Sequence, residues 1–266
     1  MIRKRIEERL TDIHAQWVAS IEDEDVKILA ERHSIITGGA IVSLLQGEEP
    51  KDYDIYFRYP ETTLSIAKYY IDKYAPDNVS IENIDGRIKI VIPSSGHIKI
   101  PEEKKKKKEP IYHPVFMSSN AIMLSDKIQI IVRFYGEPAA IHDTFDYIHC
   151  CNYWDSCDKR LVLNPKALES IINKYLIYTG SRYPVCSLLR IRKFLKRGWT
   201  INAGQILKMC FQVSNLDLSD VKVLEDQLIG VDTAYFNELV ERMKQDDVTT
   251  ITQTYLINLI EEIFGC

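Results

Sequence analysis

A glycine pair followed by two alternating aspartates constrains the fold of this chain more than any other feature. The stretch ITGGAIVSLLQGEEPKDYDIYF covers residues 36–57 and places Gly38 and Gly39 ahead of Asp52 and Asp54. DYDIYFR alternates polar and apolar residues, as a half-buried strand does. Because residues i and i+2 of a strand point to the same face, we expect the two carboxylates to lie side by side.

The two aspartates would repel each other unless a cation lay between them. Hard oxygen ligands suit Mg²⁺ or Mn²⁺, and these ions also bind the phosphates of a nucleotide. Gly38 and Gly39 complement the aspartates, because a turn without side chains lets backbone N–H groups approach an anion, and the short helix AIVSLLQ directs its positive end there. The segment therefore predicts a nucleoside triphosphate site in which Asp52 and Asp54 are metal ligands and catalytic groups.

The same segment resembles the signature of the DNA polymerase β-like nucleotidyltransferase superfamily, and most of all the branch of CCA-adding tRNA nucleotidyltransferases and bacterial poly(A) polymerases. That branch carries Gly-Gly-Ala-hydrophobic-Arg-Asp-Leu-Leu-x-Gly, followed by Lys-Asp-hydrophobic-Asp. The resemblance implies that Asp52 and Asp54 bind the catalytic metals, that Gly38 and Gly39 hold the triphosphate, and that Lys51 belongs to the nucleotide site. The positions that fit are Gly38, Gly39, Ala40, Ile41, Leu44, Leu45, Gly47, Lys51, Asp52 and Asp54.

A second match lies downstream, in SLLRIRKFLKRGWTI. It resembles the Leu-Arg-x-x-Arg-Phe-x-x-x-x-Gly-hydrophobic-x-Ile segment that opens the helical neck of the same branch. The pattern alone predicts an amphipathic helix with a basic outer face and an apolar inner face of Leu188, Leu189, Ile191, Phe194 and Leu195. A basic face also suits the phosphates of a nucleotide or an RNA. Arg190, Arg192 and Lys193 are therefore candidate nucleotide-binding residues.

The chain also departs from the branch. Val42-Ser43 replaces the Arg-Asp that follows the glycines, which removes a phosphate-contacting arginine; Ser43 either offers its hydroxyl to phosphate or lies on the helix surface. The third carboxylate of the superfamily sits on a neighbouring strand, where KIQIIV offers Gln129, a poor metal ligand. Asp146 in TFDYIHCCNYW is the acidic candidate for contacting metal or nucleotide, with an ordinary strand-end carboxylate as the alternative. A base-selecting motif has no clear counterpart, so the base stays open.

The order of patterns predicts an α+β chain with two domains. Strand signals come from the hairpin NVSIENI-DG-RIKIVIP, the pair NAIMLS-DK-IQIIVRFY and the stretch TFDYIHCCNYW. Helical periodicity marks the N-terminus, TTLSIAKYYIDKYA, and successive segments that begin with PKALESIINKYLIYT and include YFNELVERMKQ. We expect a polymerase β-like head, a mixed sheet with flanking helices, in residues 1–160, and an all-helical neck- or body-like domain in residues 161–266.

Composition and charge limit the kinds of partner and the cellular location that we expect for this protein. A formal net charge of −4 gives no overall basic signature for nucleic acid, so such a role depends on local patches. The lysines at 104–108 predict a solvated loop, with a flexible phosphate-binding arm as the alternative. No apolar run reaches the roughly 18 residues of a membrane span, and the N-terminus lacks a signal-peptide pattern, so we expect a soluble, cytoplasmic protein.

The six cysteines fit an intracellular protein without disulfides. No CxxC pair occurs, and neighbouring cysteines rarely form a good disulfide with each other. We expect buried thiols. A zinc site would need an unusual spacing, and its ligands would come from Cys150, Cys157, His142 and His149.

These patterns favour a metal-dependent nucleotidyltransferase that uses Mg²⁺ or Mn²⁺. A hydroxyl would attack the α-phosphate of a nucleoside triphosphate, and pyrophosphate would leave. The resemblance implies an RNA 3′ end, such as that of tRNA, as the acceptor. Two alternatives stay open: nucleotidylylation of a protein or small molecule, as in toxin-like relatives, and a nucleotide- or RNA-binding protein that has lost catalysis.

Overall fold

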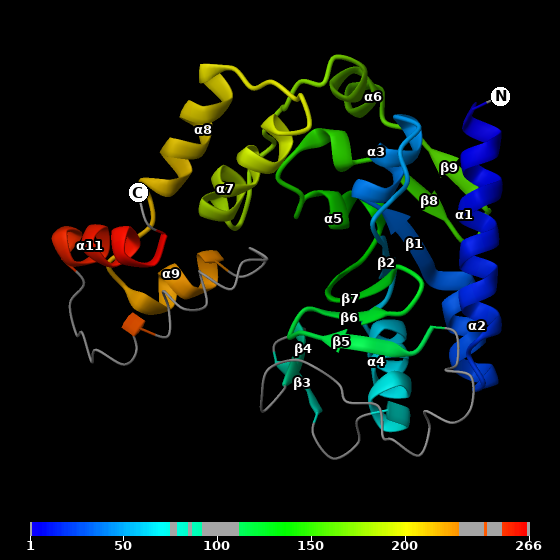
Figure 1. The fold of residues 1–266 in the computed structure, drawn as a ribbon. Coiled ribbons are helices and arrows are strands. Elements are labelled where there is room, and N and C mark those ends of the chain that lie inside the picture. The colour runs from blue at the N-terminus through cyan, green and yellow to red at the C-terminus, as the bar shows by residue number, and fades with distance from the viewer. Residues whose placement is uncertain are drawn as a thin grey trace. The chain divides into compact units, whose positions relative to one another are not determined.

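A computed structural model describes most of the chain, which divides into two compact units (Figure 1). The first unit comprises Met1–Thr144 and His149–Ile171, and the second comprises Phe145–Ile148 and Ile172–Cys266. The units alternate along the chain near their junction, and the domain boundary expected at residue 160 stays a prediction. The described residues are 2–74, 79–84, 87–91, 112–228, 242–243 and 252–264.

A seven-stranded sheet runs through the first unit in the order β5-β6-β7-β2-β1-β8-β9. β2 and β7 are parallel, whereas the other neighbours in this sheet are antiparallel, so the sheet is mixed as expected. The strands are β1 (Ser34–Thr37), β2 (Tyr53–Phe57), β5 (Pro114–Met117), β6 (Ala121–Leu124), β7 (Ile128–Tyr135), β8 (Tyr153–Asp155) and β9 (Arg160–Val162).

Two expected hairpins are confirmed. β3 (Ser80–Ile84) and β4 (Arg87–Val91) pair antiparallel with Ile84 opposite Arg87, and the two residues between them lie outside the described residues. β6 and β7 pair across the turn at Asp126 and Lys127, whose φ angles are 57° and 66°. Positive φ at both central residues is the backbone conformation that matches the twist of antiparallel strands.

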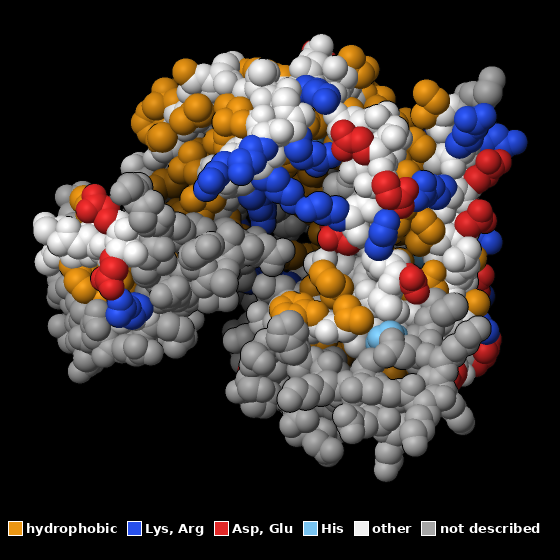
Figure 2. Space-filling model, in the orientation of Figure 1, with side chains coloured by type: hydrophobic (Ala, Val, Ile, Leu, Met, Phe, Trp, Pro, Cys, Tyr) orange, Lys and Arg blue, Asp and Glu red, His pale blue; other side chains and the backbone are white. Residues whose placement is uncertain are grey.

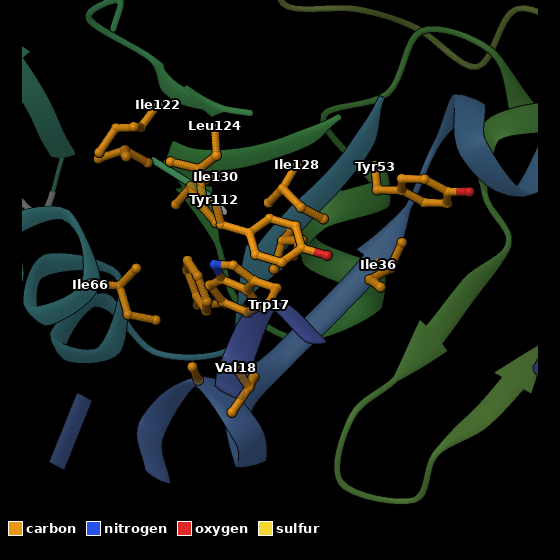
Figure 3. Packing of buried hydrophobic residues seen from close by; sticks show 14 of the residues in the cluster. Trp17, Val18, Ile36, Tyr53, Ile66, Tyr112, Ile122, Leu124, Ile128 and Ile130 are labelled. Carbon is orange, nitrogen blue, oxygen red and sulfur yellow. The ribbon is translucent and has the colours of Figure 1, made fainter. Parts of the chain in front are cut away.

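Helices flank the sheet of the first unit, and α1 to α4 share its apolar core. α1, α2 and α4 lie on the sheet together, and Trp17 of α1 is fully buried near Tyr112 and Ile130 (Figure 3). The indole Nε1 of Trp17 donates to the hydroxyl of Tyr70 at 2.8 Å, so its polar atom is satisfied inside the core. The helices are α1 (Ile2–Ala19), α2 (Glu24–His33), α3 (Gly39–Leu45), α4 (Pro60–Tyr74), α5 (Pro138–His142) and α6 (Pro165–Ile172).

Two sequence predictions fail near the junction of the units. TFDYIHCCNYW, expected as a strand, contains the 3₁₀ turn Ile148–Cys150 and contributes only the start of the short strand β8. The helix expected over PKALESIINKYLIYT ends at Ile172, because Lys174 adopts a left-handed φ of 48° and Tyr175 then bridges to Thr200. Tertiary pairing overrides the local pattern in both segments.

The second unit is helical, as expected. Its helices are α7 (Pro184–Leu195), α8 (Ala203–Val213), α9 (Val221–Leu228) and α11 (Gln253–Phe264). The prediction that Leu189 and Leu195 of α7 face inward is wrong, since they are 38% and 50% exposed. The lysine run at 104–108 and most of the helix expected over YFNELVERMKQ lie outside the described residues. No helix in the described ranges is long and apolar enough to cross a bilayer.

Candidate functional site

The glycine turn lies directly against the carboxylate of Asp54. β1 ends at Thr37, which is the Cα partner of Asp54 on β2, and Gly38 follows with φ 87° and ψ −143°. A Cβ atom built on Gly38 would lie 3.4 Å from Asp54 Oδ2, whereas one built on Gly39 would meet nothing within 4 Å. The two halves of the sequence motif therefore meet in space, beside an open position at Gly39.

Both aspartates lie at the start of β2. Asp52 immediately precedes the strand and Asp54 is its second residue; each is partly buried, and the intervening Tyr53 and the following Ile55 are buried. The expected alternation therefore holds, because the apolar residues face the core while the aspartates occupy the other positions. The N–H of Gly38 donates to the carbonyl of Cys150 at 3.3 Å, so this donor of the turn is already engaged.

The strand beside β2 brings a glutamine to the aspartates. β7 runs parallel to β2, and Gln129 is the Cα partner of Asp54. Partners on neighbouring strands point to the same face of a sheet, so the carboxamide occupies the position where a third carboxylate was sought. The described residues contain no group of three or more His, Cys, Asp or Glu that could hold a metal ion.

Two carboxylates without a third still fit a magnesium site of one common kind. Mg²⁺ is often bound by one or two carboxylates, with waters and substrate phosphates completing its octahedron. Asp52 and Asp54 would be the protein ligands of such an ion, and the open position at Gly39 leaves room for phosphate beside them. The donor set therefore fits a metal that is held jointly by protein and nucleotide.

An ion-pair cluster holds the loop between α3 and β2, and no sequence pattern predicted it. Arg9 Nη2 of α1 donates to both carboxylate oxygens of Glu49 at 2.7 Å, and Lys127 Nζ donates to Glu49 Oε1 at 3.1 Å. Lys127 also donates to the carbonyl of Pro50 at 3.2 Å, and Arg9 Nε to the hydroxyl of Tyr53 at 3.2 Å. The hydrogen bond from Arg9 lowers the pKa of Glu49. This cluster holds the residues that lead into Asp52.

A buried polar group supports the glycine turn from within the first unit. The hydroxyl of Thr37 donates to the carbonyl of Asn152 at 2.7 Å and lies 2.9 Å from His142 Nε2. Because the hydroxyl proton is directed to that carbonyl, His142 Nε2 carries a hydrogen and donates to Thr37. Burial lowers the pKa of His142, which favours the neutral ring.

The four candidate zinc ligands, Cys150, Cys157, His142 and His149, all lie in the described part of the chain. The ring of His142 is bonded to Thr37, and the described residues do not bring Cys150, Cys157 and the two histidines together as a metal cluster. No described cysteine is in a disulfide, as expected. The expectation that all thiols are buried is wrong in part: Cys157 and Cys210 are exposed.

Two further predicted residues of the first unit differ in burial. Ser43 lies in α3 with 8% exposure, so it is not the surface serine that was the alternative prediction. Its carbonyl accepts from the N–H of Glu48 at 2.8 Å, which closes the end of the helix. Lys51 is exposed next to Asp52, at the end of the loop that Glu49 fastens.

The remaining predicted residues belong to the second unit. Asp146 is 9% exposed, and Arg190 Nη1 of α7 donates to its Oδ2 at 2.7 Å. The carbonyl of Asp146 also accepts from the N–H of Thr179 at 3.0 Å. Arg192 and Lys193 are exposed on α7. The structure thus joins Asp146 to Arg190 within one unit, and a metal- or nucleotide-binding role for these residues stays a prediction.

Comparison with known proteins gives a family match over the first unit. The family model described as "Gad2: Gabija anti-defense 2 family protein" matches residues 8–174. The protein "Gabija anti-defense 2" of Bacillus phage SPbetaL7 is 24% identical over 230 residues. The aligned region is 86% of this chain and 49% of that protein, so the chain spans about half the length of this curated relative.

Solved structures of CCA-adding enzymes also align. The Thermotoga maritima CCA-adding enzyme complexed with tRNA gives a TM-score of 0.44 at 10% identity, over 94% of this chain and 54% of that one. A complex of a CCA-adding enzyme with ATP gives a TM-score of 0.48 at 15% identity, over 96% of this chain and 60% of that one. Likenesses of this degree carry no conclusion about activity or substrate.

Proposed function

The chain belongs to the Gabija anti-defense 2 family, and from that premise we propose that it is a metal-dependent nucleotidyltransferase with an anti-defense role. The family's name supports the role but does not state a reaction. One observation carries the proposed chemistry: Gly38 lies so close to Asp54 that an added Cβ would be 3.4 Å from its carboxylate. A side-chain-free turn and a carboxylate pair at one place can bind a triphosphate and its cation together.

The proposed roles follow from the geometry of the first unit. In this proposal the triphosphate lies over Gly39, where an added Cβ would meet nothing within 4 Å. Asp52 and Asp54 would hold Mg²⁺ or Mn²⁺, and such an ion would neutralise phosphate charge and favour the attack by the hydroxyl. The hydroxyl oxygen bonds to the α-phosphorus, the bond to the bridging oxygen breaks, pyrophosphate leaves, and the hydroxyl proton passes to solvent. Lys51, exposed beside Asp52, offers a further cation for phosphate.

The acceptor we propose first is an RNA 3′ hydroxyl. It is the acceptor that the motif resemblance implies, and α7 carries the cations Arg190, Arg192 and Lys193 that phosphates require. A protein hydroxyl is the second candidate, favoured by large aliphatic side chains exposed on α7 and α8. Gln129 beside Asp54 favours the third candidate, a nucleotide-binding protein that has lost catalysis.

Label transfer tests the proposed reaction. The protein is incubated with Mg²⁺, each α-³²P-labelled triphosphate in turn, and bacterial extract, beside the double variant Asp52→Asn/Asp54→Asn. We expect acid-insoluble label only with the wild-type chain, and its loss on nuclease or protease treatment identifies RNA or protein as the acceptor. Equal labelling by the double variant would overturn the assigned roles. Binding of triphosphate without any transfer would favour the third candidate.

A further inference from the structure

One segment of the second unit is free of acidic residues. Residues 172–216 contain eight Lys and Arg and no Asp or Glu, in a chain whose net charge is −4. The segment includes α7 and α8, which pack against each other. Arg190 is paired with Asp146, while Arg192, Lys193, Lys196 and Lys208 are all exposed. A strongly basic surface therefore stands out from an otherwise acidic protein.

The same surface exposes large apolar side chains. On α8, Ile206, Leu207 and Phe211 are 37%, 54% and 64% exposed. Leu207 and Phe211 are four residues apart, so they share one face of the helix, and only Met209 of α8 is buried. On α7, Leu195 is 50% exposed. Figure 2 shows hydrophobic side chains gathered over α8, with Lys and Arg side chains beside them over α7.

We propose that α7 and α8 form a docking surface for a protein partner that presents acidic side chains around an apolar patch. Contiguous apolar side chains on a helix face mark interaction sites, whereas monomers scatter such residues singly. The surrounding cations favour a partner of opposite charge. The proposed metal ligands Asp52 and Asp54 are not part of this surface, but the RNA acceptor proposed above would also use cations of α7, so the test below compares a protein-like probe with an RNA.

The apolar side chains favour a protein over a nucleic acid. Single-stranded nucleic acids bind through cations and through aromatic rings that stack on bases. Among the exposed apolar residues of α7 and α8 only Phe211 offers a ring, while Leu195, Ile206 and Leu207 are aliphatic. An apolar centre with a polar, solvent-accessible rim is the arrangement of a protein interface, and the aliphatic side chains with their neighbouring cations match it. A nucleic acid would contact the cations but would leave the apolar side chains of α8 exposed to water.

Fluorescence anisotropy with defined probes tests the proposal. The first probe is a labelled peptide of about 20 residues with Leu at helical spacing and Glu between, a length that spans such a helix face. The second replaces every Leu by Ser and keeps the charge. The third is oligouridylate of similar length, and the fourth is phosphatidylserine vesicles. We expect the first probe to bind at least about tenfold more tightly than any of the other three.

Paired variants locate the binding. Leu207→Ser/Phe211→Ser and Lys196→Glu/Lys208→Glu should each weaken binding of the first peptide by about tenfold, and added salt should weaken it further. The matched control is Ile2→Ser/Ile28→Ser, which removes exposed apolar side chains from the first unit and should not change binding of the first peptide. Thermal melting shows whether each variant is folded. No binding of the first peptide, equal or tighter binding of the Ser peptide, RNA or vesicles, or unchanged binding by the Leu207/Phe211 variant would overturn the proposal.

Discussion

Asp54 and Gln129 are paired across the parallel strands β2 and β7, so a carboxylate and a carboxamide stand side by side on the sheet. This pairing sets the charge of the candidate metal site, because a glutamine oxygen can bind a cation without neutralising it. The site therefore has the negative charge of only two carboxylates, those of Asp52 and Asp54. A carboxylate in place of Gln129 would make it more negative.

Restoring a carboxylate at this position should tighten metal binding. Gln129→Glu adds a negative oxygen ligand beside Asp54, and we expect the affinity for Mn²⁺ to rise by about tenfold, roughly the effect of one charged ligand. Titration of Mn²⁺ followed by electron paramagnetic resonance measures it. Gln129→Met is the matched neutral control and should not tighten binding. An unchanged Mn²⁺ affinity in Gln129→Glu would remove Gln129 from the site.

The two glycines of the turn should respond differently to alanine. Gly38 has φ 87° and ψ −143°, a region that only glycine adopts easily, so Gly38→Ala should lower the free energy of unfolding by about 1–3 kcal/mol. Gly39→Ala meets no atom within 4 Å and should fold normally. Since its methyl group fills the open position, Gly39→Ala should weaken triphosphate binding. Urea unfolding and nucleotide titration separate the two effects, and normal nucleotide affinity in Gly39→Ala would place the triphosphate elsewhere.

Burial of His14 should make stability depend on pH. Burial lowers the pKa of His14 to about 4, whereas the unfolded chain has a pKa near 6.5. Between these values the unfolded state binds more protons, so the free energy of unfolding falls as the pH drops from about 6.5 to about 4, by about 3 kcal/mol in total. Urea unfolding at pH 7 and pH 4.5 measures this loss.

The variant His14→Phe separates the contribution of His14 to this pH dependence from the contributions of the other histidines. His33 and His142 also have lowered pKa values, so part of the pH dependence remains in the variant. We expect the loss of stability between the two pH values to be smaller in His14→Phe than in the wild-type chain. Equal losses in both proteins would mean that His14 is not buried in the neutral form.

The ion-pair cluster at Glu49 should act on the metal site more than on stability. Glu49→Gln removes the charge that Arg9 and Lys127 share, and because Glu49 is exposed the melting temperature should hardly change. The loop that leads into Asp52 loses its ion pairs with Arg9 and Lys127. Because Asp52 is then held less precisely, Mn²⁺ affinity should fall by roughly several-fold. Glu24→Gln breaks the exposed pair with Lys27 and serves as the control. Unchanged Mn²⁺ affinity in Glu49→Gln would leave the cluster without a role at the site.

Local patterns predicted the elements that short-range geometry dictates. The helix after Gly38, the strand at Asp54 and the strand pair that breaks at Asp126 were all predicted, because glycines and the alternation of polar and apolar residues are visible within a few positions. The position of Gln129 was found as well, since a third ligand was sought on a neighbouring strand.

The remaining features depend on contacts between distant segments. Glu49 meets Arg9 and Lys127 only after α1 and the turn between β6 and β7 have packed, and nothing near Glu49 in the sequence marks it. The exposed Leu189 and Leu195 have the spacing of a core face, so periodicity predicted them inside. The spacing of apolar residues in a sequence is the same whether they face the core or an exposed surface that binds a partner.

The central claim is that the glycine turn and the aspartates bind metal and triphosphate as one site. The most direct measurement is the Mn²⁺ affinity of the chain with and without a non-hydrolysable triphosphate analogue. We predict that the analogue raises Mn²⁺ affinity by about tenfold or more, as joint coordination requires, and that Asp52→Asn/Asp54→Asn abolishes the rise. The claim would be contradicted if the analogue did not change Mn²⁺ affinity, or if it raised the affinity of the double variant by the same factor.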